Sequence, residues 1–192
     1  MTTLILGLLA FLGAHSVRIF ADNWRDAQRK RLGEGAWKGI FSLFALAGFG
    51  LMVWGYGLAR QQPVLLWAPP SGMRHLAGLL TLIAFVLLAA AYVPRNSIKS
   101  RLHHPMILGV KTWAFAHLLA NGTLADLLLF GAFLAWAIVD FISARKRDRV
   151  AGMQYAPGTP ARTAASVVAG VAAWAIFAFW LHGALIGVRP FG

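Results

Sequence analysis

Two histidines lie inside long apolar segments of this chain, where an ionisable side chain is unusual. His15 falls within residues 2–20 and His117 within residues 106–121. Ionisable groups in the membrane hydrocarbon are costly, and they usually face the interior of a helix bundle. At about 1.5 Å per residue, His15 lies roughly 20 Å and His117 roughly 17 Å from the start of its own segment. If the two helices cross in opposite directions, both imidazoles lie at intermediate depth, and we expect them to face one cavity.

Two neutral imidazoles that face one cavity are suited to be the axial ligands of a haem iron. The chain contains no cysteine, which excludes covalent c-type attachment. The pattern therefore predicts haem b, with His15 and His117 as the metal ligands. Trp113, one helical turn before His117, is predicted to line a ring face, as is Phe11 before His15. Arg18 follows His15 by three residues on the same helix face and is predicted to bind a propionate.

The same residues also have purely structural explanations, which the pattern leaves open. A single intramembrane histidine can simply form a hydrogen bond between helices. Arg18 can extend its side chain back to the membrane surface, and Trp113 can be a core residue. His182 is an alternative ligand on the last apolar segment. Three further histidines lie at a segment boundary or in a loop and are discounted as ligands: His75, His103 and His104.

The composition predicts that these residues are carried by membrane-spanning helices. Of 192 residues, 59% are hydrophobic and only 12% are charged, too few to coat a soluble domain of this size. A spanning helix needs about 20 mostly apolar residues. We therefore predict an all-α, polytopic transmembrane bundle that forms a single domain over residues 1–192. We expect about six membrane-spanning helices, at residues 2–20, 37–59, 74–93, 106–121, 124–143 and 163–187.

The positions of the basic residues predict the orientation of this bundle. Most lysines and arginines fall in the connections after the first, third and fifth spans, and the opposite side carries Arg60, Arg74 and Arg189. Because cytoplasmic loops are rich in lysine and arginine, both termini are expected to face the periplasm across a bacterial inner membrane. The net charge of +12 is explained by these clusters, so we expect no nucleic-acid partner. Residues 121–123 (Asn-Gly-Thr) predict a tight turn and an antiparallel hairpin of the fourth and fifth spans.

Four sequence motifs resemble those of the NnrU family of membrane proteins, and the resemblance covers nearly the whole chain. They are Gly13-Ala14-His15-Ser16-Val17-Arg18, His104-Pro105-Met106-Ile107-Leu108-Gly109, Trp113-Ala114-Phe115-Ala116-His117-Leu118-Leu119-Ala120-Asn121-Gly122, and Leu127-Leu128-Leu129-Phe130-Gly131 with Trp136.

This resemblance implies two different classes of function. A related branch of the family, 15-cis-zeta-carotene isomerase, is a membrane enzyme that carries haem b, and its histidines match His15 and His117. That branch implies a redox-dependent cis–trans isomerase that acts on a polyene or another apolar lipid from the bilayer. The family name instead implies a non-enzymatic membrane factor for denitrification, which supports expression of nitrite and nitric oxide reductases through haem handling or sensing.

Two other classes fit the sequence less well. The His-Pro-Met-Ile-Leu-Gly stretch is distantly similar to isoprenylcysteine and phospholipid methyltransferases. In those enzymes an arginine precedes the His-Pro pair and a later acidic pair helps to hold S-adenosylmethionine. Here His103 stands in the arginine position and the basic stretch 145–149 has no glutamate pair, so methyl transfer is disfavoured. A transporter is disfavoured by the small size, the few buried acids and the absence of a clear repeat.

Overall fold

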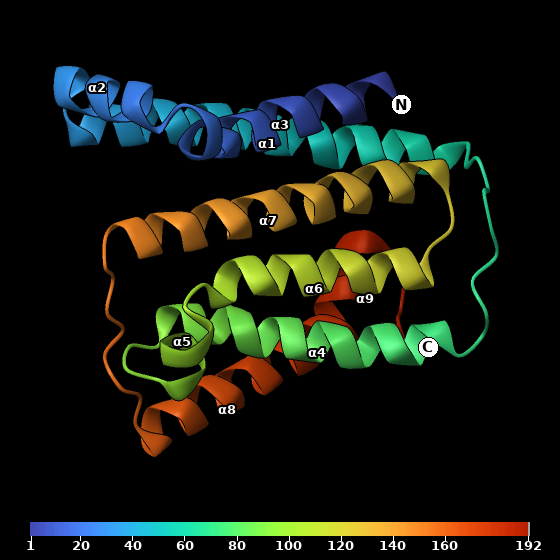
Figure 1. Cartoon of the computed structure of the whole chain (residues 1–192). Helices are drawn as coiled ribbons and strands as arrows, with labels where there is room; N and C mark the ends of the chain where they lie inside the picture. The colour runs from blue at the N-terminus through green and yellow to red at the C-terminus, as the bar shows by residue number, and fades with distance from the viewer. Residues whose placement is uncertain (192) are drawn as a thin grey trace.

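The computed structural model describes residues 1–191, and almost all of its regular structure is helical (Figure 1). The all-α bundle predicted from the sequence is therefore confirmed. The helices are α1 (Thr2–Phe20), α2 (Asp22–Leu32), α3 (Glu34–Gln61), α4 (Met73–Tyr92), α5 (Ser97–Leu102), α6 (Pro105–Ala120), α7 (Leu124–Val150), α8 (Pro160–Ile176), the π-helical segment η1 (Phe177–Leu181) and α9 (His182–Ile186).

The lengths of the apolar helices agree with a protein that is embedded in a membrane. In the part of the chain that the structure describes, five helical segments are long and apolar enough to cross: α1, α3, α4, α7 and the continuous segment Pro160–Ile186. The sixth apolar helix, α6, has 16 residues. At 1.5 Å per residue it spans about 24 Å, less than the roughly 30 Å hydrocarbon core, so its ends need polar partners at depth.

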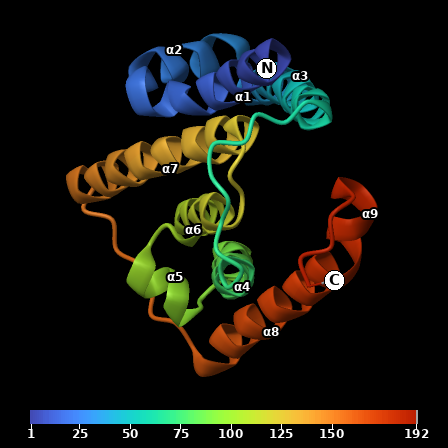
Figure 2. The ribbon, with the colours of Figure 1, turned by 90° about the vertical axis from the view of Figure 1, so that its right-hand side faces the viewer.

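The main helices pack side by side in the order α3, α1, α7, α6, α4 and α8, which differs from their order in the chain. Both termini lie at the same end of the helix axes, on the right in Figure 1. Figure 2 looks at the bundle from that end and shows α8 inclined away from the other helices. At the opposite end lie α2, α5 and the final segment of α7 (residues 145–150), which together carry more than half of the lysines and arginines. We call it the basic end.

Two glycines allow α1 and α3 to approach closely. A Cβ atom on Gly7 would overlap the backbone of Met52, and one on Gly55 would overlap the backbone of Leu4. Small residues at such contacts let the backbones of membrane helices pack against each other. Leu4 and Met52 are buried as a result, and this pair of helices fixes the position of the segment that carries His15.

The predicted antiparallel hairpin is present as α6 and α7, and the loop between α3 and α4 (residues 62–72) packs over its turn. The backbone N–H of Leu66 donates to the carbonyl of Gly122 over 2.8 Å, and the N–H of Leu124 donates to Val64 over 2.8 Å. Asp126 completes a capping box with Thr123 at the start of α7. These bonds satisfy backbone groups that would otherwise be exposed to lipid beyond the end of the short helix α6.

The structure extends helix into three stretches that the sequence analysis read as polar connections. Helices α2 and α5 lie within residues 22–34 and 95–105, and α7 continues through Arg145–Arg149 to Val150. Lysine and arginine are good helix formers, and near a helix C-terminus they interact favourably with its dipole. Arg147 also anchors the extension, because it donates to the hydroxyl of Ser143 over 2.7 Å.

Candidate functional site

His15 lies on α1 against three aromatic rings. Its ring centroid is 4.3 Å from that of Phe11, 5.1 Å from that of Phe41 and 6.1 Å from that of Trp136. Its Nδ1 atom lies 2.7 Å from the carbonyl oxygen of Phe11, one turn earlier in the same helix. The histidine is therefore held from its own helix and surrounded by apolar faces contributed by α3 and α7.

His117 occupies a similar setting on α6. Its ring stacks on Phe130 of α7, with centroids 4.5 Å apart and an interplanar angle of 28°. The ring centroid of Trp113 lies 5.2 Å away, and the Nδ1 atom of His117 is 2.9 Å from the carbonyl oxygen of Trp113. The structure thus brings together His117 and Trp113, two of the residues predicted from the sequence.

The two backbone bonds have the same chemical consequence in both histidines. A carbonyl oxygen only accepts, so the Nδ1 of His15 and the Nδ1 of His117 must each carry a hydrogen. In the neutral ring the Nε2 atom then keeps its lone pair. Histidines that ligate metals in proteins commonly donate their other N–H to a backbone carbonyl in this way.

The two histidines are separated by aromatic side chains and do not share a contact. Phe133 of α7 lies between them, 5.8 Å from Phe11 and 5.5 Å from Trp113 between ring centroids. On α7 itself, His15 packs against Trp136 and His117 against Phe130, which are six residues, or about 9 Å, apart along the axis. That the two histidines face one cavity stays a prediction.

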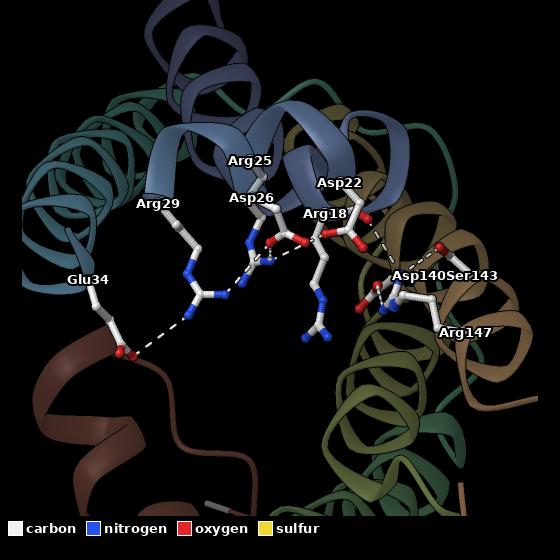
Figure 3. Close-up of polar contacts among 9 residues, drawn as sticks. All are labelled: Arg18, Asp22, Arg25, Asp26, Arg29, Glu34, Asp140, Ser143 and Arg147. Carbon is white, nitrogen blue, oxygen red and sulfur yellow. Dashed lines mark hydrogen bonds and ion pairs between the residues drawn. The ribbon is translucent and has the colours of Figure 1, made fainter. Parts of the chain in front are cut away.

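Arg18, the predicted propionate partner, lies away from both imidazole rings at the basic end. It is exposed and lines an open pocket of about 320 Å³ between α1, the start of α2 and the end of α7. Figure 3 shows its side chain extending past Asp22 toward the space beside Asp140 and Arg147. Of the predicted site residues, Arg18 is the one closest to water and to lipid headgroups.

An apolar cavity of about 270 Å³ adjoins Trp113 on the side away from His15. Its lining comes from α4, α6, α7 and η1, and includes Phe85, Leu88, Val110, Trp113, Phe133 and Phe177. Trp113 and Phe133 thus belong both to this cavity and to the aromatic layer between the histidines. The cavity has the composition expected for a long apolar ligand.

Comparison with known families identifies the chain. The family described as NnrU protein matches residues 3–190, nearly the whole length. The chain belongs to the NnrU family. No curated protein and no solved structure matches it. The family resemblance predicted from the histidine motifs is thereby confirmed. Two histidines of those motifs in this NnrU-family structure, His15 and His117, form the Nδ1 bonds described above.

His182, the alternative ligand predicted from the sequence, packs against an aromatic residue of η1 in this NnrU-family protein. It begins α9 directly after η1, its ring is 5.8 Å from Phe177, and its Nδ1 atom is 2.6 Å from the carbonyl oxygen of Val188. Phe177 lines the apolar cavity, so His182 lies beside it. Single-turn π-helical segments often accompany functional sites. His182 therefore remains a candidate alternative ligand.

Two polar features of this NnrU-family protein escaped the sequence analysis. The Nε1 atom of Trp136 is buried beside His15 and has no hydrogen-bond partner among the described residues. At the basic end, Nε2 of His104 lies 2.8 Å and the hydroxyl of Tyr155 2.9 Å from Oδ2 of Asp148. Burial, together with this bond, raises the pKa of Tyr155 to about 12. No spacing rule links residues 104, 148 and 155, so only the fold could bring them together.

Proposed function

We propose that this NnrU-family membrane protein binds haem b, with His15 and His117 as the candidate axial ligands. The observation that carries the proposal is the matched state of the two imidazoles. Each donates its Nδ1–H to the carbonyl four residues earlier and keeps the Nε2 lone pair free. A pair of neutral intramembrane histidines without cysteine fits a b-type haem. The absorption spectrum of the detergent-purified protein tests this, because a bound haem b has an intense Soret band.

The aromatic residues between His15 and His117 would have to move for a haem to bind between the two imidazoles. Phe133 fills the space between Phe11 and Trp113, so a porphyrin between the imidazoles requires the Phe133 ring to turn aside. The adjoining cavity offers space for that movement. In this arrangement Trp113 would pack against the haem. Arg18, one turn beyond His15 on α1, is the candidate cation for a propionate, and to reach it the Arg18 side chain would have to turn from the pocket at the basic end toward His15.

We further propose that the protein is a cis–trans isomerase of a polyene or another long apolar lipid. The bound haem would supply a redox-active iron that lowers the bond order of a conjugated double bond. The chain's own residues would bind and orient the substrate: Phe85, Val110 and Phe177 line an apolar cavity beside Trp113 and exclude water from it. The apolar lining favours a hydrocarbon chain that enters sideways from the bilayer.

Filling the cavity is expected to slow this isomerisation. Gly109 is a buried residue that borders the cavity, where a Cβ atom would lie 3.1 Å from the carbonyl oxygen of Ala84. Gly109→Leu should lower the conversion rate about tenfold or more, because the leucine side chain would occupy space that the substrate needs and lost apolar contacts of about 1.5–3 kcal/mol correspond to at least this factor. The measurement is the pigment profile of a strain that accumulates 9,15,9′-tri-cis-zeta-carotene.

The matched control for this variant is Gly50→Leu. Gly50 is exposed on α3 and has open space around its Cβ position, so the pigment profile should equal that of the wild type. Yield and Soret absorbance of both variants report on folding. If the wild-type protein carries haem but leaves the pigment profile unchanged, isomerase activity is refuted. The alternative, a membrane factor for denitrification, then predicts lower nitrite reductase expression in a deletion strain.

For the orientation, we propose that both termini face the periplasm across a bacterial inner membrane. The placement of the termini at the end opposite the basic end supports this, because lysine and arginine are retained on the cytoplasmic side. Alkaline phosphatase fused after Phe191 is expected to be active, whereas the same fusion after Val150 should be inactive. The reverse pattern would show that the basic end faces outward.

A further inference from the structure

The pocket at the basic end has the shape and position of a headgroup site. It has a volume of about 320 Å³ and is enclosed by the last turn of α1, the first turn of α2 and the end of α7. The residues that matter for its chemistry are Arg18, Ile19, Asp22, Lys146, Arg147 and Val150. Because it lies where apolar helices end, the pocket is at the depth of the lipid headgroups.

The charge in this pocket is predominantly positive and is not neutralised by the protein. Among residues 1–191, the side chains of Arg18 and Lys146 make no hydrogen bond or ion pair within the usual distance limits. Figure 3 shows the Arg18 guanidinium without a partner. Arg147 lies 3.7 Å from Asp140 and donates to Ser143. Asp22, the one acidic group in the lining, is bonded to Arg25 over 3.3 Å.

The rest of the lining is apolar and open to the bilayer. Ile19 and Val150 flank the cations, and Val150 is 82% exposed. A free phosphate ion would gain nothing from such a rim, whereas the glycerol backbone and upper acyl chains of a phospholipid would pack against it. Basic pockets between membrane helices on the cytoplasmic side commonly bind anionic lipid headgroups.

We propose that this pocket binds the phosphate headgroup of an anionic phospholipid. Arg18 and Lys146 approach the phosphate from α1 and α7, and Arg147 supports it from beside Asp140. The proposal stands on the pocket alone and does not depend on haem. It also gives a reason for the direction of the Arg18 side chain, because Arg18 of α1 and Lys146 of α7 line the same pocket.

Lys146→Gln tests the proposal in the intact protein. Phosphatidylglycerol is titrated into protein in a neutral detergent, and bound lipid is counted by native mass spectrometry. The variant should lose about fivefold or more in affinity for phosphatidylglycerol, the amount that one nearby basic residue contributes. The control, Arg149→Gln, removes the same charge from an exposed position outside the pocket and should change the affinity less than about twofold. Equal losses in the two variants would overturn the proposal.

Two further measurements separate the pocket from general charge and from a haem effect. Asp22→Asn removes the acidic group and should raise the affinity, whereas a loss would contradict an anionic ligand. Inorganic phosphate and phosphatidylcholine, at the same concentration as the lipid, should not displace phosphatidylglycerol. Displacement by phosphate would mark a free-anion site and refute the lipid assignment. The Soret absorbance of Lys146→Gln should equal that of the wild type, so failure of this proposal is distinct from failure of haem binding.

Discussion

Replacing His117 by alanine is expected to abolish the Soret absorbance of the purified protein. The change removes the free Nε2 atom that the Nδ1 bond to Trp113 leaves available. Mutating residues that only orient a metal ligand already costs about 10–100-fold in affinity, so loss of the ligand itself should cost more. His15→Ala should have the same effect for the same reason. The measurement is haem content per protein, from the ratio of Soret to aromatic absorbance after purification from haem-replete cells.

Two other histidines serve as controls for this result. His75→Ala removes an exposed imidazole at the start of α4 and should leave the haem content unchanged. His182→Ala tests the candidate alternative ligand. If His182→Ala loses the Soret band and His15→Ala retains it, the ligand pair is His117 and His182, and the pairing proposed from the sequence is wrong. A wild-type protein without Soret absorbance would refute haem binding altogether.

The parts of the fold that could be predicted are those set by lipid. A continuous apolar run predicts a helix because every backbone group in hydrocarbon must be satisfied within the segment. The runs that contain His15 and His117 accordingly became α1 and α6 within a residue of their predicted bounds. The helical extension of α7 through Arg145–Arg149 was not predicted, because a run of basic residues is also typical of a loop. The contacts of Arg147 with Ser143 and Asp140 that support the helix are visible only in the structure.

The candidate site likewise has features that could be predicted from the sequence and features that could not. The tautomers of His15 and His117 follow from local geometry, since an Nδ1 bond to the carbonyl four residues earlier needs only one helix. The distance between the histidines depends on which helices are neighbours. The order of the apolar segments predicts that α1 and α6 are antiparallel, but it does not predict that α7 lies between them. The position of Phe133 between the two histidines was therefore not predicted. The role predicted for Arg18 at a propionate stays a prediction. The pocket that Arg18 lines could not be anticipated, because Lys146 and Arg147 come from a helix more than a hundred residues later.

The second large effect is expected from the buried carboxylate at the start of α7. Asp126 is 5% exposed and accepts bonds from the hydroxyl of Tyr56 over 2.6 Å, from the hydroxyl of Thr123 over 2.6 Å and from the N–H of Thr123 over 3.0 Å. Asp126→Ala leaves these donors without an acceptor at a depth where water is scarce. Since hydrogen bonds to a charged group are worth about 1.5–3 kcal/mol each, the free energy of unfolding should fall by about 3 kcal/mol or more. Thermal unfolding in detergent, followed by circular dichroism, measures the change.

Tyr56→Phe separates the parts of this network, because it removes only the bond between α3 and α7 and keeps the capping box of Thr123 and Asp126. Tyr56→Phe should lower the free energy of unfolding by about half as much as Asp126→Ala does. Because both changes break the same hydrogen bond, adding Tyr56→Phe to Asp126→Ala should lower it by at most about 0.5 kcal/mol more. Strictly additive losses would show that Tyr56 and Asp126 act independently.

The carboxylate of Asp126 lies one helical turn before Phe130, the ring on which His117 stacks. Asp126→Ala should therefore also lower the haem content, whereas a variant that loses stability without losing haem would place the site beyond the influence of this helix start.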